Sequence, residues 1–392
     1  MRSEKFRYPP VMQPHNAMLT SPVAPGLETR TLSARVDLGR LSANADRLRR
    51  SAQGLGLLAV VKADAYGHGA VQVARTLETA GVDGFCVATL SEALVLRQAG
   101  VRLPIQVFTS TRPEELALAS SHAIDLTVVS SPHLRELAQL VPEHPVGLHL
   151  EVDTGMGRSG VPLAELGACL SQLRALQPRL RGIMSHFASA EESESTFTLH
   201  QHREFAKGIA ALKDGGISAP MIHQANSAGC LRGFTEGHTH VRCGIALYGL
   251  ADLDEARAIG LEPILELVAE VTRVQSVDAG TTVGYGCTYV VPHRLTLVTL
   301  NCGYADGYPR ALANRAWAEY RGICYPVVGR VSMDSITVAI PEQVPIEPRD
   351  TMILLSRDPK APHSVFQTAK LLGTIPYEVT CALNQRVVRV SA

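Results

Sequence analysis

The stretch LLAVVKADAYGHGA, residues 57–70, contains the start of the fold and a candidate for its chemistry. The apolar run from Leu57 to Val61 has the length and composition of a buried strand, and turn residues follow it. Lys62 is the first residue after this run. A surface lysine beside a core strand is one reading of this position, and a functional group at the end of a strand is the other. The rest of the chain decides between them.

Short apolar runs of this kind recur along the first two thirds of the chain, separated by segments of helical period. Repeated βα units predict a parallel sheet, and eight of them predict a (β/α)8 barrel of the TIM type. The eight runs are GLLAVV, GFCVA, PIQVF, DLTVV, VGLHLEV, RGIMSHF, MIHQA and VRCGIALYG.

Polar side chains lie at the ends of several of these runs. In a (β/α)8 barrel the carboxyl ends of the strands form one rim, which carries the chemistry. We therefore expect these side chains to meet, and Lys62 to be functional rather than a scattered surface charge. The set comprises Lys62, Asp153, Thr154, Arg158, His186, Asn226, Ser227 and Arg242.

The sequence texture divides the chain into four parts. Residues 1–28 have neither strand nor helix period and are predicted to be a loosely ordered tail. Residues 29–40 alternate like a strand that joins the later β domain. Residues 41–262 form the predicted barrel, and residues 263–392 carry alternating strands of a mainly β domain. The predicted fold class is therefore α/β, with a barrel followed by a β domain.

Composition narrows the partners. Lys plus Arg and Asp plus Glu both number 37, so the chain has no basic footprint for nucleic acid. No signal peptide or run of 18 apolar residues is present, which predicts a cytoplasmic protein that does not bind membranes. The eight cysteines form no CxxC pair, so the sequence predicts no metal site and favours a reducing compartment.

A lysine on a rigid strand end, in a partly apolar site, can lose its proton and form a Schiff base with an aldehyde cofactor. Pyridoxal 5'-phosphate is the natural candidate. Its phosphate requires backbone N–H groups and hydroxyls, which ANSAG after the seventh run and RCGI in the eighth can supply. Ser227, Gly244 and Ile245 are the predicted phosphate ligands.

Eight ordered motifs resemble those of the alanine racemases from about residue 30 to the C-terminus. They are VVKADAYGHG, VDTGMGRSG, SHFA, ANSAG, GIALYG, VGYG, CGYADGYPR and GRVSMD. The resemblance implies interconversion of L- and D-alanine by two bases on opposite faces of the cofactor-bound substrate. Lys62, which binds the cofactor, would be one base, and Tyr285 of the VGYG motif would be the other. It also implies D-alanine supply for peptidoglycan.

In that family the tyrosine comes from the partner subunit's β domain, so the resemblance implies a homodimer with shared sites. Tyr285 needs neighbours to act as a base at neutral pH, because a tyrosine pKa is ordinarily near 10. His186 and Arg242 are the expected neighbours. Arg242 would also face the pyridine nitrogen of the cofactor and oppose its protonation, which limits side reactions.

The remaining implied contacts hold the substrate and the phosphate. Arg158 would bind the substrate carboxylate together with the backbone N–H of Met333 from the partner. Tyr66 and Tyr377 would add hydroxyls to the phosphate site. Tyr304 would narrow the entrance, so that small side chains are favoured.

Two positions depart from the family pattern. Glu151 stands where relatives often carry a lysine whose modified, negatively charged form positions the active-site arginine. We expect Glu151 to supply that negative charge to Arg158 directly. Cys243 stands where proline is common, and if it lies beside the phosphate cup, thiol reagents should inactivate the enzyme.

Three alternatives share parts of this pattern. A racemase of broader range, acting on serine or basic amino acids, would keep both bases. A decarboxylase of the same architecture would present a carboxylate to the pyridine nitrogen, where Arg242 stands here. A protein that only carries the cofactor would lack the β domain with Tyr285, Tyr304 and Met333.

Overall fold

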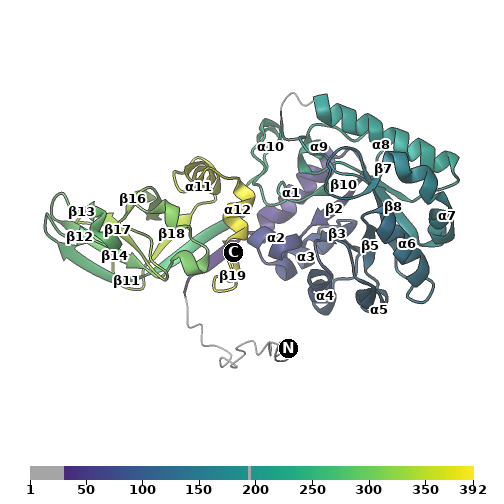
Figure 1. The fold of residues 1–392 in the computed structure, drawn as a ribbon. Helices are drawn as coiled ribbons and strands as arrows, with labels where there is room; N and C mark the ends of the chain where they lie inside the picture. The colour runs from purple at the N-terminus through teal and green to yellow at the C-terminus, as the bar shows by residue number, and fades with distance from the viewer. Residues whose placement is uncertain (1–30, 193–195) are drawn as a thin grey trace, which may run out of the picture.

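The structure is a computed structural model that describes residues 31–192 and 196–392. It has two lobes, a barrel and a β domain, which lie side by side in Figure 1. The tail predicted for residues 1–28 lies outside the described residues.

The first lobe is a closed barrel of parallel strands, which confirms the predicted fold class. Neighbouring strands hydrogen-bond in the order β10-β2-β3-β4-β5-β6-β8-β9. The ring closes between β9 and β10, where the N–H of Thr239 donates to the carbonyl of Ile222 over 2.8 Å. Each predicted run corresponds to one barrel strand, and β7 (Val161–Pro162) pairs with β6 outside the ring. The barrel strands are β2 (Gly56–Val60), β3 (Gly84–Val87), β4 (Ile105–Val107), β5 (Asp125–Val128), β6 (Leu148–Asp153), β8 (Leu180–Met184), β9 (Met221–His223) and β10 (His240–Cys243).

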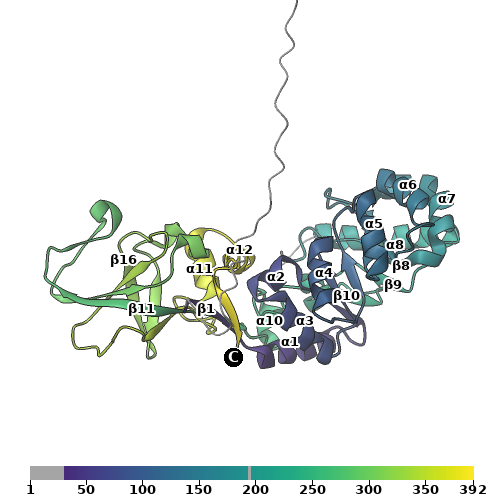
Figure 2. The same ribbon diagram turned by 90° about the horizontal axis from the view of Figure 1, so that it is seen from below.

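Helices cover the outside of the barrel (Figure 2). The first of them shows why: its buried residues Leu41, Ala45 and Leu48 recur at helical spacing, and the Asp37 side chain caps its N-terminus by accepting from the N–H of Arg40. None of the described helices is both long and apolar enough to cross a bilayer. The helices of this lobe are α1 (Leu38–Ser51), α2 (Lys62–Gly67), α3 (Ala70–Thr79), α4 (Leu90–Gln98), α5 (Leu116–Ser121), α6 (Ser131–Leu140), α7 (Leu166–Leu176), α8 (Thr196–Asp214), α9 (Ser227–Leu231) and α10 (Asp254–Ala258).

The second lobe is a mostly antiparallel sheet in the order β14-β17-β16-β15-β18-β11-β1-β19. The long strand β11 pairs with β18 through its first half and with β14 through its second half, which closes the sheet on itself. A separate hairpin joins β12 to β13. The elements of this lobe are β11 (Leu265–Val277), β12 (Thr282–Val283), β13 (Tyr289–Val290), β14 (Leu295–Leu300), β15 (Trp317–Tyr320), β16 (Ile323–Val328), β17 (Ile336–Ile340), β18 (Thr351–Leu355), α11 (Val365–Leu372), α12 (Pro376–Cys381) and β19 (Val388–Ser391).

The N-terminal strand β1 (Ser33–Val36) belongs to this second sheet, where it pairs with β11 and β19. The chain then enters the barrel at once, because α1 begins at Leu38. The chain therefore passes from the β domain to the barrel within residues 29–40, the range predicted to be a strand joining the β domain.

The last residues of the chain pack on the turn that follows the first barrel strand. A side chain at Gly67 would overlap the carbonyl of Thr380 in α12. The Arg389 Nε donates to the carbonyl of Gly67 over 3.0 Å, and the rings of Tyr66 and Tyr377 lie 5.8 Å apart. The two lobes thus meet at the predicted site.

Candidate active site

Lys62 stands at the start of an unusual turn. The next four residues, 63–66, all have left-handed backbone angles, with φ between 51° and 54°, a conformation that costs roughly 1–2 kcal/mol for each non-glycine residue. Two carboxylates hold it: Glu92 accepts the N–H of Ala63 over 2.7 Å, and Asp64 accepts the N–H of Ala70 over 2.7 Å. The strained turn is therefore fixed by its neighbours, as is common where a functional group must be placed.

The side chain of Lys62 is half-buried beside other cations. Burial, and then the charge of Arg158, lower its pKa. A lowered pKa increases the fraction of neutral amine, which is the form that attacks a carbonyl or accepts a proton. Arg158 itself is exposed at the rim.

Arg242 is 2% exposed and lies in the barrel with both Nη atoms engaged. Nη1 contacts the carbonyl and Nδ1 of His223, each over 2.8 Å. Nη2 donates to the carbonyls of Ser185 and Gln224 and contacts His186 Nδ1 over 3.1 Å. Burial and the Arg242 charge lower the pKa of His186 well below its ordinary value, so that this imidazole is neutral. The guanidinium is thus rigidly oriented.

A line of buried histidines continues from Arg242 across the barrel. His223 Nε2 lies 3.1 Å from Nδ1 of His149, and His149 Nε2 lies 3.7 Å from a carboxylate oxygen of Asp125. Burial, then Arg242, lower the pKa of His223. His149 and His223 were not among the predicted site residues, because a histidine inside an apolar strand looks like core; their inward positions in VGLHLEV and MIHQA were the available signal.

The predicted barrel residues line adjoining cavities. A cavity of about 450 Å³ is lined by residues that include Lys62, Arg158, His186 and Arg242. A smaller one, of about 130 Å³, shares Lys62, His186 and Arg242 with it and adds Tyr66, Asn226, Ser227, Gly244, Ile245 and Tyr377. Of the polar rim set, Asp153 and Thr154 line neither of these two cavities.

The smaller cavity has the form of an anion cup. The Ser227 hydroxyl accepts the N–H of Gly244 over 3.0 Å, and the Asn226 side chain caps the short helix α9. A side chain at Gly244 would overlap the Tyr66 hydroxyl, so only glycine permits this close approach. Backbone N–H groups, a hydroxyl and a phenol in one concave place suit a phosphate.

Two side chains at this cup differ from expectation. The Tyr377 hydroxyl donates to Glu191 over 2.8 Å, which burial and Glu191 reinforce by raising the pKa of the tyrosine. Cys243 does not face the cup, because it is fully buried. A hydrogen bond with Cys230, followed by burial, raises the pKa of the Cys243 thiol, so it lies beyond easy reach of thiol reagents.

Glu151 is 5% exposed and lines the larger cavity with Arg158. Burial raises its pKa, against the opposing effects of Ser159 and of the two arginines. Among the described residues no ion pair within 4.0 Å joins Glu151 to Arg158, but both line the same cavity and the charge of Arg158 acts on the pKa of the carboxyl, so Glu151 remains a candidate partner of this arginine at longer range.

The β domain does not bring its predicted residues to this cavity. Tyr285, Met333 and Tyr304 are 71%, 52% and 42% exposed. One segment, residues 329–333, connects the three. Its backbone passes Gly284 and the Arg330 side chain passes Gly286, on the two sides of Tyr285. The carbonyls of Ser332 and Met333 then accept the N–H groups of residues 304 and 305. The hairpin β12–β13 that flanks Tyr285 lies at the end of the β domain remote from the barrel (Figure 1).

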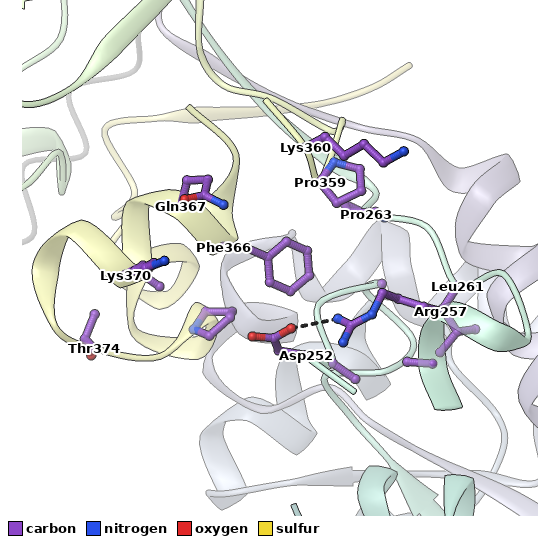
Figure 3. Close-up of a pocket in the computed structure, with 15 residues that line it drawn as sticks. Asp252, Arg257, Leu261, Pro263, Pro359, Lys360, Phe366, Gln367, Lys370 and Thr374 are labelled. Atoms are coloured by element: carbon purple, nitrogen blue, oxygen red, sulfur yellow. Dashed lines mark hydrogen bonds and ion pairs between the residues drawn. The ribbon is translucent and has the colours of Figure 1, made fainter. Parts of the chain in front are cut away.

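A larger cavity, of about 610 Å³, lies at the junction of the two lobes and contains none of the predicted residues (Figure 3). Three cationic side chains line it, Arg257, Lys360 and Lys370, and Arg257 is paired with Asp252 over 2.8 Å. Size therefore does not identify the active site in this molecule; the convergent polar groups do.

Glu92 is a further residue that the sequence analysis missed. The pattern Thr89-x-x-Glu92 predicts a capping box, and the structure contains one. The second role of Glu92, its hydrogen bond to the turn after Lys62, depends on the packing of two neighbouring βα units and has no local signature.

Comparisons with known proteins agree with this geometry. Residues 36–252 match the family model "Alanine racemase, N-terminal domain", and residues 264–391 match "Alanine racemase, C-terminal domain". The chain is similar to an alanine racemase of Syntrophobacter fumaroxidans, with 37% identity over 89% of this chain and 94% of that protein. It is also similar to alanine racemase 2 of Bacillus subtilis, with 35% identity over 85% of this chain and 87% of that one.

Solved structures give the same result. The alanine racemase of Streptomyces coelicolor superposes with a TM-score of 0.86 at 33% identity, covering 93% of this chain and 98% of that one. The Bacillus anthracis alanine racemase with bound L-Ala-P superposes with a TM-score of 0.83 at 33% identity, covering 91% and 94%.

Proposed function

This chain belongs to the alanine racemase family, and we propose that Lys62 and Tyr285 carry the two proton transfers of its reaction. The chain is an isomerase that interconverts L-alanine and D-alanine, and the family depends on pyridoxal 5'-phosphate. When bound, this cofactor withdraws electrons from the substrate α-carbon and makes its C–H bond acidic. The residues present fit the cofactor, because the cup at Gly244 accepts no side chain.

Lys62 would hold the cofactor and serve as the base on one face of the substrate. The support is its position at a strand end, in a cavity with other cations and with a lowered pKa. The left-handed turn leaves its side chain at the rim while Glu92 fixes the backbone beside it. Nζ would therefore take a proton from the substrate α-carbon, or return one to it, from a fixed position.

Arg242 would face the pyridine nitrogen of the cofactor and keep it unprotonated. It is a buried cation whose two Nη groups are held by barrel carbonyls, so it accepts no proton and disfavours a second positive charge beside it. Neutral His186 shares this environment and provides a hydrogen-bonding partner for a catalytic phenol.

The cup and the rim would hold the two anions. Ser227, with the N–H groups of Gly244 and Ile245, would bind the cofactor phosphate, and Tyr66 would add a hydroxyl. Tyr377 would add its hydroxyl by exchanging its hydrogen bond to Glu191 for one to the phosphate. Arg158 would bind the substrate carboxylate.

Tyr285 would serve as the second base, supplied to the cavity by another copy of the chain. The observation that carries this proposal is the contrast between the cavity, which gathers the barrel residues, and Tyr285, which is 71% exposed on the other domain. Met333 and Tyr304 lie beside it and would close the partner's cavity, holding the carboxylate and limiting the size of the side chain. We therefore propose a homodimer with two shared sites.

A mixed-dimer experiment tests this arrangement. Lys62→Ala and Tyr285→Phe should each be nearly inactive alone. After unfolding and refolding together in equal amounts, half of the dimers are mixed, and one of two sites in each is intact, so about one quarter of the wild-type activity should return. No recovery, with mixed dimers verified by differently tagged chains, would place both bases in one chain and refute the shared site.

We also propose a cytoplasmic enzyme that supplies D-alanine for peptidoglycan. All eight cysteines are free thiols, which suits a reducing compartment. Growth of a bacterial strain that depends on added D-alanine tests the biosynthetic role: the gene for this chain should remove the dependence, and the Lys62→Ala form should not.

A further inference from the structure

A glutamate, a cysteine and a histidine meet in the β domain, on the other lobe from the barrel cavity. Glu319 and Cys324 are paired residues across the β15–β16 hairpin. His363 comes from the segment between β18 and α11. One ligand-capable atom of each residue lies within 4.8 Å of those of the other two. Carboxylate, thiolate and imidazole are the groups that bind Zn²⁺ in proteins.

The distances inside this cluster suit a metal ion. His363 Nδ1 lies 3.6 Å from the Cys324 Sγ, and His363 Nε2 lies 3.4 Å from a carboxylate oxygen of Glu319. Bonds of about 2.0–2.3 Å in a tetrahedral zinc site hold the ligand atoms roughly 3.3–3.6 Å apart. The two contacts involve different nitrogens of the imidazole, so an ion bound by Nε2 and Glu319 requires the Cys324 side chain to rotate away from Nδ1. The three ligand atoms already lie within 4.8 Å of one another.

His363 supplies an independent observation. It is 2% exposed, and its Nε2 atom is buried without a hydrogen bond, because the nearby Glu319 oxygen does not have the required geometry. A buried polar atom without a partner costs about 1–3 kcal/mol. A metal ion between the imidazole and the carboxylate would satisfy it.

We propose that Glu319, Cys324 and His363 form a Zn²⁺ site with water as the fourth ligand. Three protein ligands and one water complete a tetrahedral zinc site. Glu319 and Cys324 are partly exposed, so an ion reaches the cluster from solvent. The Cys324 thiol binds as the thiolate and releases its proton to water when the metal binds.

The site would join two parts of the β domain that are remote in the sequence. The hairpin β15–β16 holds two ligands, and the third directly precedes α11, which continues into α12 and Tyr377 at the phosphate cup. Binding would stabilise this connection between the hairpin and the segment before α11. Ligand spacings of 5 and 39 residues match no compact zinc motif, which is why the sequence predicted no metal site.

Metal binding to the holoenzyme tests the proposal. Enzyme freed of metals with a chelator and dialysed against buffered Zn²⁺ should retain about one zinc per chain and show a higher thermal midpoint. With Co²⁺ as the probe, a thiolate-to-cobalt charge-transfer band should appear in the difference spectrum. Cys324→Ser and His363→Gln should each weaken binding by about 10-fold or more and remove that band or shift it.

His293→Asn is the matched control, because this histidine is exposed in the same domain and should leave zinc binding unchanged. Glu319→Gln keeps the shape of the side chain and repeats the test if the other variants do not fold, as judged by racemase activity. Equal zinc retention by wild type and all three ligand variants would overturn the proposal, as would a wild-type enzyme without a cobalt–thiolate band.

Discussion

The barrel rim and the exposed face of the β domain carry the two halves of the proposed chemistry, and they are built in opposite ways. Arg242 is 2% exposed and Ser227 is 5% exposed, and both are held by hydrogen bonds within the chain. Tyr285 is 71% exposed and Met333 is 52% exposed. Exposed aromatic and methionine side chains that gather on one face are typical of protein interfaces. The proposed cofactor cup is therefore buried within the chain, whereas the proposed second base is exposed on the other domain.

The largest effect on activity should come from a substitution at the barrel rim. Lys62→Ala should lower racemisation by about 10⁴-fold or more, because it removes both the covalent attachment and one base. The absorption band of bound cofactor should disappear at the same time. Lys207→Ala, on an exposed face of α8, is the control and should retain full activity. Racemisation by the Lys62 variant at the wild-type rate would exclude this residue as a base.

A substitution on the exposed face of the β domain should lower kcat without loss of the cofactor. Tyr285→Phe should lower kcat by about 10²- to 10⁴-fold while cofactor absorbance and the thermal midpoint stay unchanged, because the lost hydroxyl is exposed in the single chain. Tyr66→Phe, in the buried half, should instead weaken cofactor retention. If Tyr285→Phe released the cofactor as Tyr66→Phe does, the contrast between the two halves would collapse.

The buried half should also be sensitive to acid. Burial lowers the pKa of His68 to about 4 from an ordinary 6.5. The unfolded chain therefore binds more protons between these values, so the free energy of unfolding falls as the pH drops below 6.5, by about 2 kcal/mol at about pH 5 from this group. Urea unfolding at about pH 5 and above pH 6.5 measures this change in the free energy of unfolding. His68→Gln should flatten the dependence, and His293→Asn should not; equal slopes in all three proteins would contradict the assignment.

Cofactor affinity should depend on the close approach of Gly244 to the Tyr66 hydroxyl in the cup. Gly244→Ala should weaken pyridoxal phosphate binding by about 10-fold, because its methyl group would overlap the Tyr66 hydroxyl. Gly167→Ala is the matched control, since no heavy atom lies within 4 Å of the added carbon in α7. Equilibrium dialysis against the cofactor distinguishes them, and equal affinities would show that the cup is looser than described.

The smallest effect concerns the charge balance at the rim. Glu151→Gln should raise the KM for alanine by about 3- to 10-fold with little change in kcat, because a buried anion near two arginines would be lost. Steady-state kinetics in both directions checks this. An unchanged KM would show that Glu151 takes no part in binding the substrate.

Patterns that repeat were predictable from the sequence, whereas contacts between remote segments were not. The eight barrel strands follow from apolar runs of strand length, and the rim residues follow from their positions at strand ends. Three contacts between remote segments could not be predicted: the hydrogen bond of Glu92 to the turn after Lys62, the pairing of Tyr377 with Glu191, and the burial of Cys243 against Cys230. Each depends on how neighbouring units pack.

The position of Tyr285 illustrates a second limit. Its motif identified it as a candidate base, but no local pattern states whether a residue faces its own barrel or another copy. Only the fold shows that the hairpin β12–β13, which flanks Tyr285, lies at the end of the β domain remote from the barrel (Figure 1).

The contact of the C-terminal residues with the turn after Lys62 has a consequence for protein synthesis. Tyr66 and Gly67 leave the ribosome well before Tyr377, Thr380 and Arg389, which pack on them. At about 5–20 residues per second, the newborn turn waits roughly 15–65 seconds for these partners. A chain that is cut short before residue 376 therefore lacks the side chains that pack on this turn, so completion of the proposed cofactor site waits for synthesis of residues 376–389.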